Sequence, residues 1–142
     1  MWRLKPKINP PSVYHGTAQS GAGGAAQAFR HANNRRIAEI RNILGKEMVA
    51  GSLNVMLDEN FDWERRYFRA RLLDLADRSS GLSGSWVQRW VRFYPLNVNG
   101  TTAWAMRFEG EYYYPANFLE LVSDRPLRPL LDEQQRLEIL SV

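Results

Sequence analysis

The chain has 142 residues, of which 44% are hydrophobic and 12% aromatic, enough for a single buried core and too few for two independent domains. It contains no cysteine and two histidines, which excludes a disulfide framework, a thiolate zinc site and a cysteine nucleophile, and suits a reducing cytoplasm. The net charge of +4 favours an anionic partner such as a phosphate compound, although a solvated basic surface accounts for the same charge.

The N-terminal residues predict an extended arm ahead of one domain. Residues 1–12 are polar and rich in proline, and no apolar segment typical of a signal peptide follows them. We therefore assign 1–12 to the arm and 13–142 to the domain, with Val13-Tyr14 as its first short strand. Nowhere do 18 apolar residues run together, so we expect a protein that does not span a membrane and that works in the cytoplasm.

The patterning downstream predicts short strands with few helices. Alternating apolar and polar residues favour strands, apolar residues at helical spacing favour a helix, and segments rich in glycine or serine favour loops. The first predicted elements are a loop over 18–28, a helix over about 30–44 closed by Gly45, and a strand over 49–57. A connector over 79–85 leads to a hairpin with strands over 86–96 and 101–108, joined by the turn at 97–100. A tyrosine-rich segment over 112–121, a short helix after 124–128 and a strand over 136–140 complete the chain. Residues 61–80 show no clear period. The pattern indicates a mainly β fold with short helices, arranged as a small barrel.

Three landmarks follow one another in the order found in a known family. They are Ser20-Gly21-Ala22-Gly23-Gly24, then Gly51-Ser52-Leu53-Asn54-Val55-Met56-Leu57, and then Tyr113-Tyr114-Pro115 followed by Phe118-Leu119-Glu120-Leu121 and Leu127-Arg128. Together they resemble the archaeal CTP-dependent riboflavin kinases, in which a GxGxG-like loop and a helix precede a G-T-L-N-V-x-L strand and, later, H-Y-P, L-E-I-I and L-R. The similarity covers residues 13–140 and is weakest over 58–90.

This resemblance implies a fold and an activity. The fold is a single-domain cradle-loop (RIFT-like) β-barrel. The activity is the Mg²⁺-dependent transfer of the γ-phosphate of CTP to the ribityl hydroxyl of riboflavin, which yields CDP and FMN. The expected partners are therefore a nucleoside triphosphate, CTP by resemblance, and riboflavin or another compound with an acceptor hydroxyl.

The glycine-rich loop is the expected phosphate site. Glycines turn their backbone N–H groups toward one point without interference from a Cβ, and such nests bind phosphate. The loop lacks the lysine of a P-loop, and a plain glycine-rich turn explains the same spacing. The loop residues that the resemblance assigns to the nucleotide are Gly21, Ala22, Gly23, Gly24 and Ala25.

Ser52 and Asn54 are the expected metal ligands. They match the Thr and Asn that hold Mg²⁺ in the family, and Ser in place of Thr keeps the oxygen. Their i, i+2 spacing on a strand puts both side chains on one face, and neutral oxygens suit Mg²⁺ when a triphosphate supplies the negative charge. The alternative is that they lie on a solvent face or make a turn hydrogen bond.

The segment Arg125, Pro126, Leu127 and Arg128 matches the one that borders the cytidine nucleotide in the family. Arg128 is our first choice for a contact with phosphate or base. In the alternative interpretation, Arg125 or Arg128 forms a surface ion pair with Asp124 or Asp132. Such ion pairs are common and contribute little to the free energy of folding.

Glu120 is the candidate catalytic residue. It matches the glutamate that contacts the flavin side in the family. An acid within the apolar run 118–121 either points out to water or is held in place for a purpose. As a carboxylate it can orient the acceptor hydroxyl or accept its proton.

The chain departs from the family at the flavin side. Tyr113 replaces the histidine of H-Y-P, and Tyr112 stands where the family has a threonine that touches flavin. Ala25 stands where the family has the last glycine of the loop, and residues 132–135 stand where the family has a Gly-Asp pair. Nucleotide binding tolerates these changes better than flavin binding does, so a non-catalytic barrel that binds a nucleotide or another small ligand is the first alternative function.

A nucleic-acid-binding protein is the second alternative. Aromatic residues are interleaved with arginines over 63–94, as in surfaces that stack bases and contact phosphates. Aromatic residues that alternate along strands are nevertheless more typical of a core. The aromatic residues are Trp63, Tyr67, Trp86, Trp90 and Tyr94, and the arginines are Arg65, Arg66, Arg69, Arg89 and Arg92.

Overall fold

The computed structural model describes residues 12–19, 38–49, 52–75, 86–110 and 115–142. Within these ranges seven strands form one antiparallel sheet. They are β1 (Val13–Ala18), β2 (Leu53–Leu57), β3 (Phe68–Leu75), β4 (Trp86–Val98), β5 (Thr101–Phe108), β6 (Phe118–Val122) and β7 (Arg136–Ser141). Residues 38–44 are α-helical, and a 3-10 turn, η2 (Arg128–Leu130), precedes β7. The expectation of a mainly β fold with short helices is confirmed.

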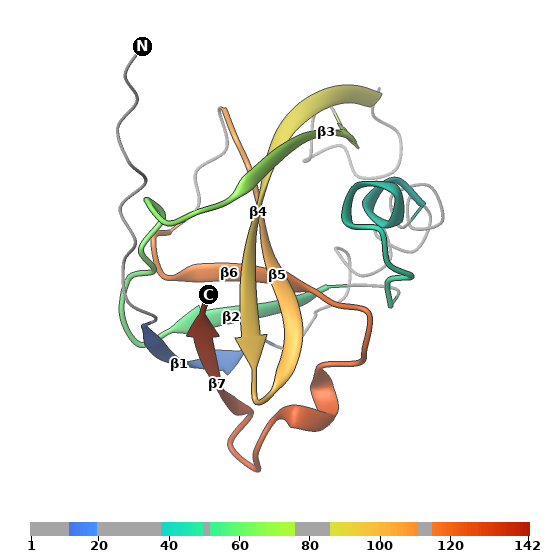
Figure 1. Cartoon of the computed structure of the whole chain (residues 1–142). Coiled ribbons are helices and arrows are strands. Elements are labelled where there is room, and N and C mark those ends of the chain that lie inside the picture. The colour runs from blue at the N-terminus through green and yellow to red at the C-terminus, as the bar shows by residue number, and fades with distance from the viewer. Residues whose placement is uncertain (1–11, 20–37, 50–51, 76–85, 111–114) are drawn as a thin grey trace.

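The sheet closes on itself. The strand order is β3-β4-β5-β6-β2-β1-β7, and β7 also pairs with β4, with Val98 opposite Ile139. The ring therefore runs through β4, β5, β6, β2, β1 and β7, while β3 lies beside β4 outside the ring (Figure 1). Closure pairs the edges that a sheet otherwise exposes.

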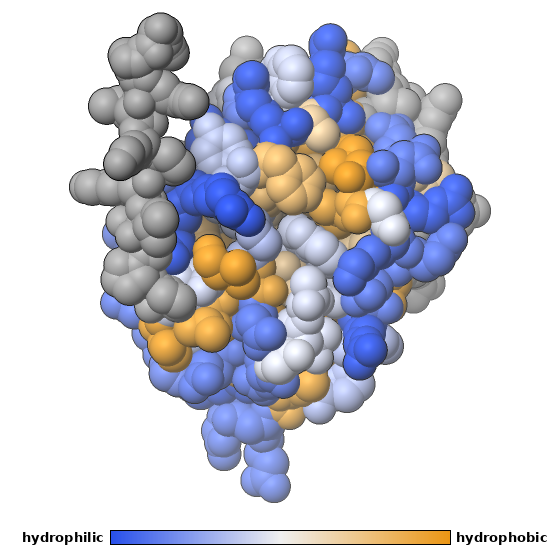
Figure 2. All heavy atoms as spheres, viewed as in Figure 1, coloured by the Kyte–Doolittle hydropathy of each residue, from blue (hydrophilic) through white to orange (hydrophobic). Residues whose placement is uncertain are grey.

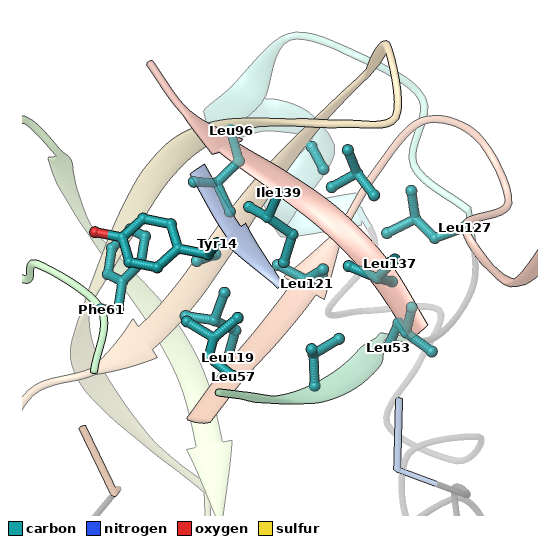
Figure 3. Packing of buried hydrophobic residues seen from close by; sticks show 14 of the residues in the cluster. Tyr14, Leu53, Leu57, Phe61, Leu96, Leu119, Leu121, Leu127, Leu137 and Ile139 are labelled. Atoms are coloured by element: carbon teal, nitrogen blue, oxygen red, sulfur yellow. The ribbon is translucent and has the colours of Figure 1, made fainter. Parts of the chain in front are cut away.

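Alternate side chains of the ring strands fill its interior. Leu53, Val55 and Leu57 are buried, as the alternation of this segment predicts. They pack with apolar side chains from the other ring strands and from Phe61 and Leu127 outside the strands (Figure 3). The partners labelled in that view are Tyr14, Phe61, Leu96, Leu119, Leu121, Leu127, Leu137 and Ile139. Removal of this apolar surface from water supplies the main driving force for closure of the ring.

A second apolar cluster lies on the opposite face of β3, β4 and β5. Successive side chains along a strand point to opposite faces, so Phe93 belongs to this cluster while Tyr94 belongs to the first. Ile40 of the helical segment is 3% exposed and packs into the second cluster. The segment ends at Gly45, which has φ of 73° and donates its N–H to Arg41 O at 2.7 Å.

The predicted hairpin between β4 and β5 is confirmed. Asn99 and Gly100 form its turn with φ of 47° and 87°, the combination that a two-residue hairpin turn needs. Asn97 Oδ1 accepts a hydrogen bond from Gly100 N at 2.7 Å. Strand β4 runs to Val98, two residues beyond the predicted end.

Strand β3 arises in a region where no period was evident. Ala70 and Leu72 face the second cluster, but the alternate positions carry Arg69 and Arg71 instead of small polar residues. Aromatic residues just before the strand obscure the alternation further. Residues 1–11 of the predicted arm, residues 20–28 of the predicted loop and the 79–85 connector lie outside the described residues, whereas Ala18, the predicted start of the loop, is the last residue of β1. None of the helical residues described here belongs to a helix long and apolar enough to cross a membrane.

Apolar side chains also reach the surface. In Figure 2 orange apolar residues emerge in patches between strongly hydrophilic ones. Within the described ranges, the exposed large hydrophobic residues are Val13, Tyr67, Phe68, Trp90, Leu140 and Val142.

Candidate functional site

A cavity of about 210 Å³ lies where β2 begins and β6 ends. Ser52 and Leu53 form one wall, and the segment 125–128 forms another. The complete described lining is Val49, Ser52, Leu53, Leu121, Ser123, Arg125, Pro126, Leu127 and Arg128. The volume is below the roughly 300–1,000 Å³ of most small-molecule sites. The fold thus brings the predicted metal corner and the predicted nucleotide segment to one place.

Backbone hydrogen bonds and one buried serine hold these walls. Val49 N donates to Ser123 O at 2.9 Å and ties the approach to β2 to the end of β6. Ser123 is 2% exposed, and its hydroxyl donates to Thr102 O at 2.7 Å and accepts from Arg125 N at 3.2 Å. The turn that carries Arg125 is therefore anchored to the sheet.

Leu127 anchors the second half of the same segment. Its side chain is 7% exposed and packs into the interior cluster, and its carbonyl accepts the N–H of Leu130 to form η2. Arg125 and Arg128 on either side of it are exposed. A buried leucine between two exposed arginines holds the backbone while leaving the guanidinium groups accessible at the rim of the cavity.

The neighbouring aspartates have other partners. Asp124 Oδ2 lies 3.8 Å from Lys46 Nζ. Asp132 Oδ1 accepts the backbone N–H groups of Gln134 and Arg136, both at 2.9 Å. These contacts do not support the alternative in which the two aspartates serve to pair the arginines at the cavity.

Ser52, Asn54 and Glu120 form a polar group next to this cavity. Asn54 on β2 lies directly opposite Glu120 on β6, so both point to the face opposite the interior cluster. Ser52 Oγ donates a hydrogen bond to Glu120 Oε2 at 3.1 Å. Ser52 thus both lines the cavity and contacts the candidate catalytic carboxylate.

Asn54 Oδ1 is buried and has no hydrogen-bond partner. An unsatisfied buried oxygen costs about 1–3 kcal/mol, so its presence requires an explanation. Together with a serine hydroxyl and a carboxylate, it offers the hard oxygen ligands that Mg²⁺ prefers. The residues present therefore fit the predicted metal. Within the described ranges no three of His, Cys, Asp and Glu gather as a metal site, so the candidate ligand set is this mixed one.

Several predicted site residues lie outside the described residues. These are the loop residues Gly21, Ala22, Gly23, Gly24 and Ala25, together with Tyr112, and their assignments stay predictions. Val49 and Ser123 also line the cavity, and no motif in the sequence marks them. The only local signal for Ser123 is its position as the first polar residue after the apolar end of β6.

Comparison of the sequence with models of known protein families and with curated proteins finds no match.

Proposed function

We propose that this chain binds a nucleoside triphosphate with Mg²⁺ at the cavity beside Ser52 and transfers its terminal phosphate to a hydroxyl acceptor. In this proposal the closed sheet is a cradle-loop barrel like that of the CTP-dependent riboflavin kinases which the sequence resembles. One observation carries the proposal: Ser52, which lines a cavity together with Arg125 and Arg128, donates a hydrogen bond to Glu120, the residue that lies opposite Asn54 on the neighbouring strand.

Ser52 Oγ and Asn54 Oδ1 would hold the metal ion. The burial of Asn54 Oδ1 without a hydrogen bond supports this role, because a metal ligand needs a lone pair that no other group uses. Mg²⁺ supplies charge neutralisation of the phosphates and polarises the phosphoryl group that is transferred.

The arginines would contact the phosphates. A guanidinium group presents a planar fork of N–H donors that matches phosphate oxygens, and both groups are exposed at the rim. The apolar walls formed by Leu53, Leu121 and Leu127 suit one face of a base. CTP as the donor and riboflavin as the acceptor rest on the sequence resemblance.

Glu120 would act on the acceptor side. Its carboxylate already accepts a hydrogen bond from Ser52, so it orients that hydroxyl and stands beside the proposed metal position. A carboxylate there can also accept the proton that the acceptor hydroxyl loses as the phosphate–oxygen bond forms.

Calorimetric titration tests the proposal. CTP, ATP, GTP and UTP are titrated with and without Mg²⁺, and the tightest nucleotide is then incubated with riboflavin while FMN formation is followed. We expect Mg²⁺-dependent binding that is tightest for CTP, and transfer to riboflavin. Binding without transfer to riboflavin or to other hydroxyl compounds would leave the binding barrel as the function, and no nucleotide binding would remove the proposal.

Variants at Asn54 separate the site from the fold. In Asn54→Val we expect Mg²⁺-dependent nucleotide affinity to fall at least about tenfold, since a metal ligand is lost. The free energy of unfolding without nucleotide should stay within about 1 kcal/mol of the parent or rise, because the variant removes an unsatisfied buried oxygen. Arg128→Ala should also weaken binding, and Arg66→Ala is the matched control because Arg66 is exposed and is absent from the described cavity lining. An Asn54→Val protein with unchanged Mg²⁺ dependence would refute the metal assignment.

A further inference from the structure

Three arginines stand side by side across β3, β4 and β5. Arg69 lies opposite Arg92, and Arg92 lies opposite Arg107, so the three side chains project from one face of the sheet. Side chains at such positions are about 5 Å apart at Cβ, and like charges directly opposite one another destabilise a sheet. Arg71, opposite Trp90, extends this row along β3. We call these four residues the arginine row.

The arginine row continues the interior face of the ring beyond the apolar core. Along β4 this face carries buried Leu96 and Tyr94, then half-buried Arg92, then Trp90, which is 41% exposed. The same face thus changes from apolar to cationic over a few residues. This change occurs where β4 leaves the ring and pairs with β3.

Glu109 compensates only part of the charge. Its Oε2 accepts Arg69 Nε at 2.8 Å and Arg92 Nε at 2.7 Å, and its Oε1 accepts Arg69 Nη2 at 2.8 Å. These hydrogen bonds, that from Arg69 first, lower the pKa of Glu109 to about 2. One carboxylate shared by Arg69 and Arg92 carries a single negative charge against the two positive charges of these guanidinium groups.

Aromatic rings hold the guanidinium groups in place. Arg69 and Arg71 lie over the ring of Trp90 at 4.1 and 5.4 Å from its centroid. Arg92 lies over Tyr67 at 4.4 Å, and Arg107 lies over Trp63 at 4.0 Å. Stacking of this kind fixes the guanidinium planes, and the N–H groups that do not bind Glu109 can contact other anions. A hollow of about 420 Å³ beside Arg92 and Arg107 gives access to the row.

We propose that this face binds single-stranded nucleic acid. The N–H groups of the arginine row contact phosphates, and unpaired bases stack on the outer planes of the guanidinium groups that lie over Trp90 and Tyr67. Trp90 and Tyr67, 41% and 36% exposed, favour a single strand over a duplex, because only unpaired bases present their ring faces. None of these residues belongs to the described lining of the cavity at Ser52, so the two sites are separate.

Fluorescence anisotropy with a labelled oligothymidylate and a labelled oligouridylate of about 12 nucleotides tests this proposal. The full chain is titrated between about 50 and about 200 mM salt, in the presence and absence of excess CTP. We expect a complex that weakens steeply with salt, that CTP does not compete away, and that forms better with the single strand than with a duplex of the same length.

Four variants assign the complex to this face. Arg71→Gln and Arg69→Gln should each reduce the slope of log affinity against log salt by about 0.7, as expected for one lost phosphate contact to a single strand. Trp90→Ala should lower affinity at least about fivefold, while Trp90→Phe, which keeps a ring for stacking, should recover most of it. Arg41→Gln, an exposed arginine on the helical segment, is the matched control for charge and should change neither quantity.

Several results would overturn the proposal. They are the absence of a salt-dependent complex, and a preference for the duplex over the single strand. Heparin binding as tight as oligonucleotide binding, together with no effect of Trp90→Ala, would also overturn it. Competition by CTP would show that the oligonucleotide binds at the cavity beside Ser52 instead. Circular dichroism of each variant distinguishes a lost contact from a lost fold. If Arg69→Gln fails to fold because Glu109 loses its partner, Arg71→Gln decides, since the Glu109 hydrogen bonds that the structure describes come from Arg69 and Arg92.

Discussion

At the scale of single residues, Glu109 and Asn54 are held in opposite ways. Glu109 receives hydrogen bonds from two arginines, whereas the buried Oδ1 of Asn54 receives none. The first arrangement stabilises the folded chain by lowering the pKa of a carboxyl group. The second costs stability, and unsatisfied buried oxygens are rare in folded proteins.

The lowered pKa of Glu109 predicts a pH dependence of stability. The folded-state pKa is about 2, below the ordinary value of 4.5, so the stabilisation is fully present above about pH 4.5 and is lost as pH falls toward 2. Glu109→Gln lacks this contribution. We therefore expect the urea midpoint of the parent to fall more than that of the variant between about pH 5 and about pH 3, and the two to converge at low pH.

Urea unfolding of both proteins at about pH 5, 4 and 3 measures this difference. Comparison of the two proteins removes the contribution of other carboxyl groups, including Asp58, whose pKa Arg136 lowers. Parallel curves for the parent and the variant would show that the Arg69 and Arg92 contacts of Glu109 do not stabilise the fold.

At the scale of elements, the close approach of β1 to β2 depends on Gly16. A Cβ at this position would lie 2.7 Å from Val55 Cγ1 and 2.8 Å from Met56 O. The carbonyl oxygen belongs to the paired backbone and cannot move without breaking the β1–β2 ladder. Gly16 is thus required by space rather than by an unusual φ.

Gly16→Ala should therefore destabilise the fold by about 1–3 kcal/mol, the usual cost of overpacking. Thermal and urea unfolding monitored by circular dichroism measure the change. His15→Ala is the control, since His15 is the exposed neighbour on the same strand. Equal stability of the glycine and alanine proteins would mean that β1 and β2 can separate without cost.

At the scale of the whole molecule, closure of the ring depends on its last strand. Strand β7 pairs with β1 on one side and with β4 on the other, and contributes buried Leu137 and Ile139 to the core. Ser141 N also donates to Ser12 O at 2.9 Å, and Ser12 N donates to the side-chain Oγ of Ser141 at 2.8 Å. The two ends of the described domain are thereby joined.

Deletion of residues 136–142 should abolish cooperative unfolding. Loss of two buried aliphatic side chains costs about 2–5 kcal/mol each, and the opened edges of β1 and β4 add to this, against a typical total stability of about 5–15 kcal/mol. Removal of Val142 alone, which is 61% exposed, should leave the transition unchanged. A sharp thermal transition in the longer truncation would show that the remaining strands form a stable open sheet.

Local patterns in the sequence determined the parts of the structure that depend on neighbouring residues. The alternation over 53–57 determines which face of β2 is buried, and Asn99-Gly100 determines the hairpin, because side-chain direction and turn conformation are properties of a few adjacent residues. Only the tertiary structure decided that Ser52 reaches Glu120, that β7 closes the ring on β4, and that Arg69, Arg92 and Arg107 form one row. Each of these depends on the register between strands distant in the chain, and a shift of one residue in register would turn every side chain to the other face.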